Sequence, residues 1–230
     1  FTEPVRYGRI AGWTTSPQAY AEACVADGTV DRATLDWLAD YRFSGNIWGY
    51  AEGEMFFPYS PILVVESSFA EGVILETLVL SILNHDSAIA AAASRMTAAA
   101  DGRPCIEMGS RRTHEESAVA SARAAYLAGF AATSNLEARR RFGVPTTGTS
   151  AHAFTLLFDS EEDAFRAQLT AQGAGTTVLV DTYDVESAVR TAVEIAGPGL
   201  GAVRLDSGDL AEQAGRVRKL LDSLGATSTR

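Results

Sequence analysis

The sequence predicts an α/β fold: a partial (β/α) barrel over residues 101–230, preceded by an α+β region over residues 1–100. After residue 101, short apolar runs alternate with helix-length segments, and this alternation is typical of a parallel sheet. Polar residues follow each of the five runs, as they do at the active-site end of a (β/α) barrel. A closed barrel needs about eight strands. Five strands therefore indicate either an open sheet or a barrel completed by further residues of a longer protein. We favour the second interpretation.

The first hundred residues predict helices followed by a small β module. Helix starts are expected at residues 16–20 and 31–35, in an otherwise polar stretch. Strands are expected at Glu54–Phe57 and Ile62–Glu66, on either side of a turn that contains two prolines. This region carries little recognisable chemistry.

A long helix is predicted over Ser68–Ala100. Its apolar residues lie on nearly all sides, so we expect it to be buried. The apolar run is long enough to suggest a membrane span, but Glu76 and Asp86 interrupt it. Charged groups are costly at the centre of a bilayer, and a core helix is the better interpretation. On a buried helix, His85 is predicted to be a core histidine with a hydrogen-bond partner.

The barrel region contains five predicted β/α units. The strands are expected at Cys105–Met108, Ala131–Ser134, Val144–Thr149, Thr177–Asp181 and Ala202–Asp206. The helices are expected at Glu115–Gly129, Asn135–Phe142, Glu161–Gln172, Val185–Ala196 and Asp209–Leu224. The last two strands are apolar up to a final aspartate, as expected of strands covered on both faces.

Composition narrows the possible partners. The 19 basic and 29 acidic residues give a net charge of −10, which argues against non-specific binding to nucleic acid or to anionic membranes. A local basic pocket remains compatible with this charge. Cys24 and Cys105 form no C-x-x-C pair, so neither a disulfide framework nor a zinc site is suggested. With no signal-peptide pattern at the start, a cytoplasmic protein is expected.

His152 is the most distinctive candidate for chemistry. It ends the small-residue run Gly148–His152, after a predicted strand. A neutral imidazole titrates near neutrality and is a competent nucleophile. A lone histidine in such a place is more often structural, so its interpretation depends on the neighbouring loops.

Three of these loops together form a specific pattern. They are Gly109–Arg112, Gly129–Asn135 and Gly148–His152. Further matching runs are Gly49–Glu54, Leu75–Leu78, Asn84–Asp86 and Arg204–Asp209. With this set, the sequence resembles the nicotinate phosphoribosyltransferases of the type II phosphoribosyltransferase superfamily.

The resemblance implies an irregular α/β barrel with an attached N-terminal domain. It also implies formation of nicotinate mononucleotide and pyrophosphate from nicotinate and phosphoribosyl pyrophosphate, driven by ATP with Mg²⁺. A homodimer is expected for the full-length protein. In the family, the loops that bind the 5′-phosphate would follow residue 230, so we expect this chain alone not to complete the active site.

The resemblance also assigns catalytic roles. His152 matches the histidine that ATP phosphorylates, Asp181 would orient its ring or hold magnesium, and Asp206 would accept the ribose hydroxyls. Asp184 is equally compatible with a helix cap, and Asp209 with a cap or a metal contact.

The predicted substrate-binding residues supply charge, stacking and hydrogen bonds. Arginine side chains can bind phosphates and a carboxylate in a two-pronged way. Ser134 stands where nicotinamide-using relatives carry an aspartate, and its hydroxyl would donate to the nicotinate carboxylate. Met108 stands where relatives often carry a stacking phenylalanine. The full set is Met108, Arg111, Ser134, Asn135, Thr149, Arg204, Ser207 and Asp209. Arg112 either joins it or pairs with Glu115 or Glu116.

Other functions stay open at this point. A quinolinate phosphoribosyltransferase would share the barrel but would need a more basic pocket and no phosphorylated histidine. A nicotinamide phosphoribosyltransferase, an inactive fragment, a regulatory module and an unrelated phosphate-binding barrel are further alternatives.

Overall fold

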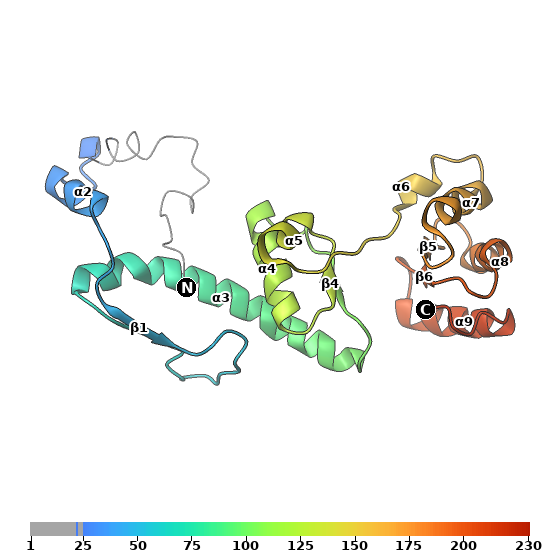
Figure 1. Ribbon diagram of the computed structural model, residues 1–230, viewed down its shortest axis with the longest axis horizontal. Coiled ribbons are helices and arrows are strands. Elements are labelled where there is room, and N and C mark those ends of the chain that lie inside the picture. The colour runs from blue at the N-terminus through green and yellow to red at the C-terminus, as the bar shows by residue number, and fades with distance from the viewer. Residues whose placement is uncertain (1–21, 23–24) are drawn as a thin grey trace. The chain divides into compact units, whose positions relative to one another are not determined.

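A computed structural model describes residue 22 and residues 25–230 (Figure 1). The chain divides into two compact units, Phe1–Asn84 and His85–Arg230. This boundary lies within the long helix, whereas the sequence places the change of organisation after it, at residue 100. The predicted helix start at residues 16–20 lies outside the described residues.

The first unit contains helix α2 (Arg32–Ala39) and strands β1 (Asn46–Gly49) and β2 (Leu63–Glu66). Helix α2 begins where the sequence predicts, because the Asp31 carboxylate accepts a hydrogen bond from the Thr34 amide at 2.7 Å. The two strands pair antiparallel, with Asn46 opposite Glu66. The small β module is therefore a hairpin.

The predicted strand at Glu54–Phe57 is wrong. These residues belong to the loop between β1 and β2 and carry no strand pairing. Gly53 turns the chain with a φ of +87°, and Pro58 follows the apolar residues without a backbone donor for a ladder. Met55 and Phe57 are consequently exposed to solvent.

Helix α3 (Phe69–Ala100) confirms the predicted long helix. Its N-terminus is fixed by a reciprocal cap, in which the Glu71 carboxylate accepts from the backbone amide and hydroxyl of Ser68 at 3.2 and 2.9 Å. The same carboxylate accepts from the Ser44 amide at 2.8 Å. Glu71 thus fixes the segment before β1 to the start of α3.

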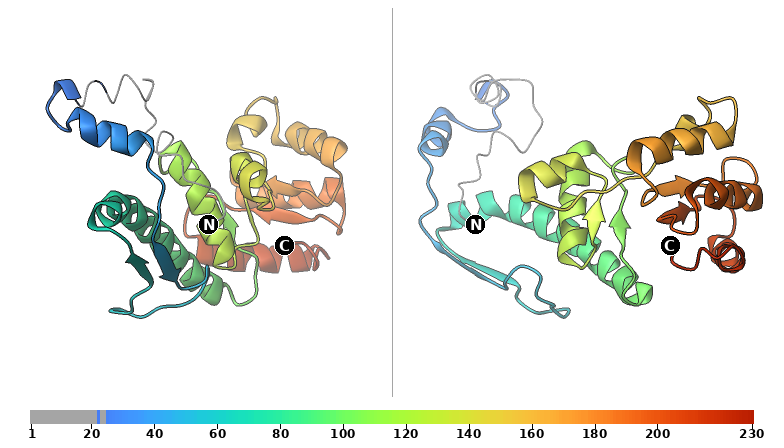
Figure 2. Two further views of the ribbon diagram at one scale, coloured as in Figure 1. Left: turned by 60° about the vertical axis from the view of Figure 1, so that its left-hand side comes forward. Right: turned by 45° about the vertical axis from the view of Figure 1, so that its right-hand side comes forward.

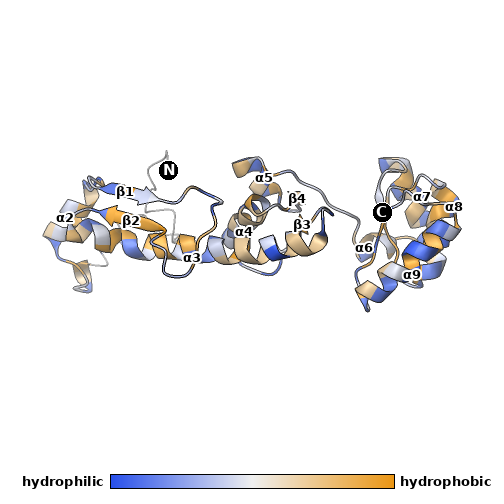
Figure 3. Ribbon diagram, turned by 90° about the horizontal axis from the view of Figure 1, so that it is seen from below, coloured by the Kyte–Doolittle hydropathy of each residue, from blue (hydrophilic) through white to orange (hydrophobic). Residues whose placement is uncertain are grey.

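The expectation that this helix is buried is wrong for the described residues. Apolar residues are spread along α3 (Figure 3), but Val73, Leu80 and Ile82 are exposed. The apolar pattern shows which side chains would be stabilised by burial. It does not identify an element that would cover them. By length and composition α3 could cross a membrane, and it is the one helix among the described residues for which this holds.

In the second unit, the C-terminal part of α3 is followed by β3 (Ile106–Glu107), α4 (Glu115–Leu127), β4 (Ala132–Thr133) and α5 (Leu136–Phe142). Strands β3 and β4 are parallel, as predicted. The predicted strand Val144–Thr149 reduces to one parallel bridge between Thr133 and Thr146. Pro145 lacks an amide donor and Gly148 weakens a strand, which accounts for the shortening.

The unit continues with two further strands and four helices. They are α6 (His152–Thr155), α7 (Glu161–Gln172), β5 (Thr177–Leu179), α8 (Val185–Ala196), β6 (Ala202–Arg204) and α9 (Leu210–Ser223). Strands β5 and β6 are parallel and lie among α7, α8 and α9 (Figure 2). The short α6 was not predicted.

The main core lies between β5, β6 and their helices. Phe165, Val178, Val189, Leu200 and Leu221 are among its largest buried members. The segments that precede these strands approach closely at Gly201, where an added Cβ would lie 2.2 Å from the Gly175 carbonyl oxygen. The predicted β/α order and parallel pairing are confirmed, while the described strands form separate pairs instead of one continuous sheet.

Candidate active site

Six of the predicted site residues come together at the ends of β5 and β6. We call this group the histidine cluster; it comprises Thr149, His152, Asp181, Arg204, Asp206 and Ser207. Hydrogen bonds or ion pairs connect each member to another. The sequence predicts these residues individually, and the structure shows how they contact one another.

His152 and Asp181 form the centre of the cluster. The ring Nε2 lies 3.0 Å from Asp181 Oδ1. The histidine side chain is 40% exposed, whereas the aspartate side chain is 1% exposed. His152 is the first residue of α6. The arrangement holds Nε2 against the carboxylate while the side chain as a whole stays partly exposed.

Asp181 is held by donors on its other oxygen. Oδ2 accepts from the Ser207 hydroxyl at 2.7 Å and from the Asp206 amide at 2.8 Å. Burial raises the pKa of this carboxyl, but the hydrogen bonds from Ser207, Asp206 and His152 outweigh that effect, and its pKa lies below the ordinary aspartate value. Asp181 is therefore a carboxylate near neutral pH.

Arg204 connects β6 to the segment that carries His152. Its Nη1 donates to Thr149 Oγ1 at 2.6 Å and to the Ser150 carbonyl oxygen at 3.4 Å. Its Nη2 lies 3.0 Å from Asp206 Oδ2. The guanidinium thus positions the loop and also pairs with the predicted ribose-binding carboxylate.

Two of the candidate aspartates are helix caps. Asp184 accepts from the Ser187 amide at 2.8 Å at the start of α8. Asp209 accepts from the Glu212 amide at 3.0 Å at the start of α9. Both contacts match the capping alternative that the sequence left open.

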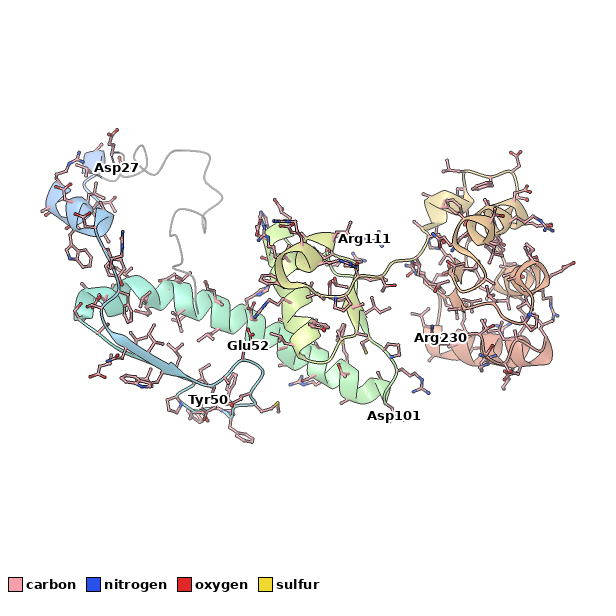
Figure 4. The ribbon with its side chains drawn as sticks, in the orientation of Figure 1. Asp27, Tyr50, Glu52, Asp101, Arg111 and Arg230 are labelled. Carbon is pink, nitrogen blue, oxygen red and sulfur yellow. The ribbon has the colours of Figure 1, made fainter. Side chains whose placement is uncertain are left out.

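The remaining predicted residues lie on the loops after β3 and β4. Met108, Arg111 and Ser134 are exposed, and Figure 4 labels Arg111 on the loop after β3. Asn135 caps α5 by accepting from the Ala138 amide at 3.0 Å. Glu116 pairs with Arg141, not with Arg112.

Sequence reasoning missed two residues beside these loops. Glu107 and Thr133 lie at the ends of β3 and β4, and their side chains are hydrogen-bonded at 2.6 Å. We call the group Glu107, Gly109, Ser110, Thr133 and Asn135 the anchor cluster. The available signal was a glutamate near the end of a predicted strand, directly before a site loop.

No group of three or more acidic, cysteine or histidine side chains among the described residues could hold a metal ion. Asp181 already uses both oxygens for hydrogen bonds. Magnesium is usually held by one or two carboxylates together with substrate phosphates. The half-exposed Asp206 suits that kind of site.

Comparison with known proteins shows extended similarity. No family model matches the chain. It is 58% identical over 240 residues to "Nicotinate phosphoribosyltransferase pncB1" of Mycobacterium tuberculosis (strain H37Rv), covering 98% of this chain and 54% of that protein. It is 38% identical over 186 residues to the nicotinate phosphoribosyltransferase of Bacillus subtilis, covering 78% of this chain and 38% of that protein. The chain spans about half the length, or less, of these curated relatives.

Solved structures agree with this similarity. The nicotinate-nucleotide pyrophosphorylase of Pyrococcus furiosus matches with a TM-score of 0.77 and 30% identity, over 82% of this chain and 50% of that chain. Human nicotinic acid phosphoribosyltransferase matches with a TM-score of 0.78 and 25% identity, over 92% and 54%. The fold is therefore that of the type II phosphoribosyltransferases. Within that class, the chain is homologous to part of the nicotinate phosphoribosyltransferases.

Proposed function

We propose that the protein containing this chain is a nicotinate phosphoribosyltransferase of NAD biosynthesis. It would form nicotinate mononucleotide and pyrophosphate from nicotinate and phosphoribosyl pyrophosphate, with hydrolysis of ATP. The His152–Asp181 pair carries this proposal: a ring open on one side contacts a buried carboxylate on the other. The homology to enzymes named for this reaction supports it.

The contact with Asp181 supports a different role for each ring nitrogen. Because ionised Asp181 only accepts hydrogen bonds, Nε2 carries the proton and Nδ1 has the free lone pair. Nδ1 would attack the γ-phosphorus of ATP, and the bond from that phosphorus to the bridging oxygen would break to release ADP. Asp181 would stabilise the positive charge on the phosphorylated ring. Water would later cleave the nitrogen–phosphorus bond and release inorganic phosphate.

The other residues would bind the phosphoribosyl and pyridine groups. The Asp206 carboxylate can accept hydrogen bonds from two ribose hydroxyls, and its pairing with Arg204 fixes its orientation. Ser134 would donate to the nicotinate carboxylate, and Arg111 supplies a nearby exposed positive charge on the loop after β3. Met108 would pack against the pyridine ring.

Mg²⁺ would be held by Asp206 together with substrate phosphates, and when bound it neutralises charge on those phosphates. ATP is the proposed co-substrate. We also propose that the full-length protein is a cytoplasmic homodimer that binds neither nucleic acid nor membranes, in keeping with the net charge of −10 on these 230 residues.

A product assay on the full-length protein tests the function. Nicotinate, nicotinamide and quinolinate are each incubated with phosphoribosyl pyrophosphate and Mg²⁺, with and without ATP, and the nucleotides are separated by chromatography. We expect nicotinate mononucleotide, formed faster with ATP. Preferred use of nicotinamide or ATP-independent use of quinolinate would support the corresponding alternative, and no product from any base would support a non-catalytic protein.

A further inference from the structure

We propose that Glu107 is a positioning residue that fixes the two loops bearing Met108, Arg111 and Ser134. The assignment of nicotinate as the ligand of these loops rests on the proposed function. The connection between them depends only on the contacts of the anchor cluster.

Glu107 contacts both loops through one carboxylate. Its Oε1 accepts from the Gly109 amide at 2.5 Å, on the loop after β3. Its Oε2 accepts from the Thr133 hydroxyl at 2.6 Å, at the end of β4. The Thr133 residue is 0% exposed, so water does not compete for its hydroxyl. Each oxygen therefore fixes a different strand end.

The hydrogen bonds continue into the loop after β4. The Thr133 hydroxyl accepts from the Asn135 amide at 3.0 Å, and Asn135 Nδ2 donates to the Ser110 hydroxyl at 3.0 Å. Ser110 directly follows Gly109, which closes a ring of contacts through Glu107. Ser134 lies between Thr133 and Asn135 in the sequence, so both of its neighbours belong to this ring of contacts. Its own amide donates to the Glu107 carbonyl oxygen at 2.9 Å.

Gly109 gives independent support for this interpretation. An added Cβ at this position would lie 2.7 Å from Glu107 Oε1, too close for the carboxylate to stay where it is. Gly109 is not among the described glycines with a positive φ, so the backbone itself does not require glycine. A side chain at this position would therefore displace the Glu107 carboxylate from its contact.

A carboxylate suits this position better than an amide. Both partners are donors, and a carboxylate offers an acceptor to each. A glutamine would keep an acceptor for the Gly109 amide but turn its NH₂ group toward Thr133, so the buried Thr133 hydroxyl would lose the acceptor of its proton. Removing the Thr133 hydroxyl should break the same connection from the other strand.

The test uses the full-length protein with Glu107→Gln, Gly109→Ala and Thr133→Val, and with Thr133→Ser as the conservative variant. Glu115→Gln, an exposed carboxylate at the start of α4, is the matched control. Two readouts are compared: amide hydrogen exchange of peptides spanning residues 106–112 and 132–138 without substrate, and the nicotinate KM, kcat and ATP-dependent phosphorylation of His152.

We expect Glu107→Gln, Gly109→Ala and Thr133→Val to speed exchange in both peptides by about tenfold or more, since hydrogen bonds to charged groups are the stronger ones. The nicotinate KM should rise by about the same factor, with His152 phosphorylation unchanged. Thr133→Ser and Glu115→Gln should behave as wild type. Exchange equal to wild type, or faster exchange across the whole protein, would overturn the proposal. If the wild type makes no nucleotide, the proposed function fails, and the exchange data still decide the role of Glu107.

Discussion

The histidine cluster and the anchor cluster are both built on one carboxylate at the end of a parallel strand, yet their partners differ. Asp181 follows β5 and contacts a titratable ring, whereas Glu107 ends β3 and contacts a backbone amide and a buried hydroxyl. A carboxylate beside an imidazole sets which nitrogen is protonated. A carboxylate between fixed donors sets the shape of two loops. The same residue class thus serves reactivity in one cluster and geometry in the other.

The largest effect is expected from Asp181→Asn, which keeps the shape of the side chain but removes its charge. An amide favours the wrong ring tautomer and no longer stabilises the charged ring, so His152 phosphorylation should fall by about 1000-fold. The nicotinate KM should stay near wild type. Asp184→Asn is the control, because asparagine caps a helix as well as aspartate does. Equal loss in both variants would contradict a specific role for Asp181.

Ser134→Asp should change specificity on the other loops without altering His152 chemistry. A carboxylate there repels nicotinate and accepts from the amide of nicotinamide, so the ratio of kcat/KM for the two bases should shift by about 100-fold toward the amide. Competing the two bases in one assay measures the ratio directly. An unchanged ratio would show that Ser134 does not contact the carboxylate or amide group of the base.

Ser207→Ala tests the role of Asp181 through the pH dependence of His152 phosphorylation. The Ser207 hydroxyl helps to lower the pKa of Asp181, so its loss should raise that pKa. The acid limb of His152 phosphorylation, measured between pH 4 and 8, should then move to higher pH, with a loss of about tenfold at the wild-type optimum. A lower rate with an unmoved acid limb would mean that Ser207 acts elsewhere.

The smallest effect is expected from Thr149→Val, which removes one acceptor of Arg204. Arg204 keeps its contacts to Ser150 and Asp206, so His152 phosphorylation should fall by only about threefold. Rapid-quench kinetics would resolve the change. A loss as large as that of Asp181→Asn would show that Arg204 acts mainly through Thr149.

The sequence predicts the local features that depend on short patterns. Alternating apolar runs and helices predict the β/α order and the parallel pairs, and capping residues such as Asp31 predict helix starts. The loop positions of His152 and Asp181 predict that both lie near strand ends, and the structure places them in contact.

What the sequence does not predict depends on partners distant along the chain. The apolar pattern of α3 does not specify what covers it, and Pro145 shortens a strand that its neighbours favour. In the sequence, Glu107 is only one polar residue in a predicted strand. Its role depends on its contact with Thr133 on the adjacent strand and on the close approach of Gly109.

The proposed mechanism requires His152 to accept a phosphoryl group through the ring nitrogen that Asp181 leaves free. The most direct measurement is incubation of the full-length protein with γ-labelled ATP and Mg²⁺, followed by mapping of acid-labile, base-stable phosphate. We predict label on His152, none on His85 or His114, and none in His152→Ala. Absence of label in the wild type, or label that persists in His152→Ala, would contradict the mechanism.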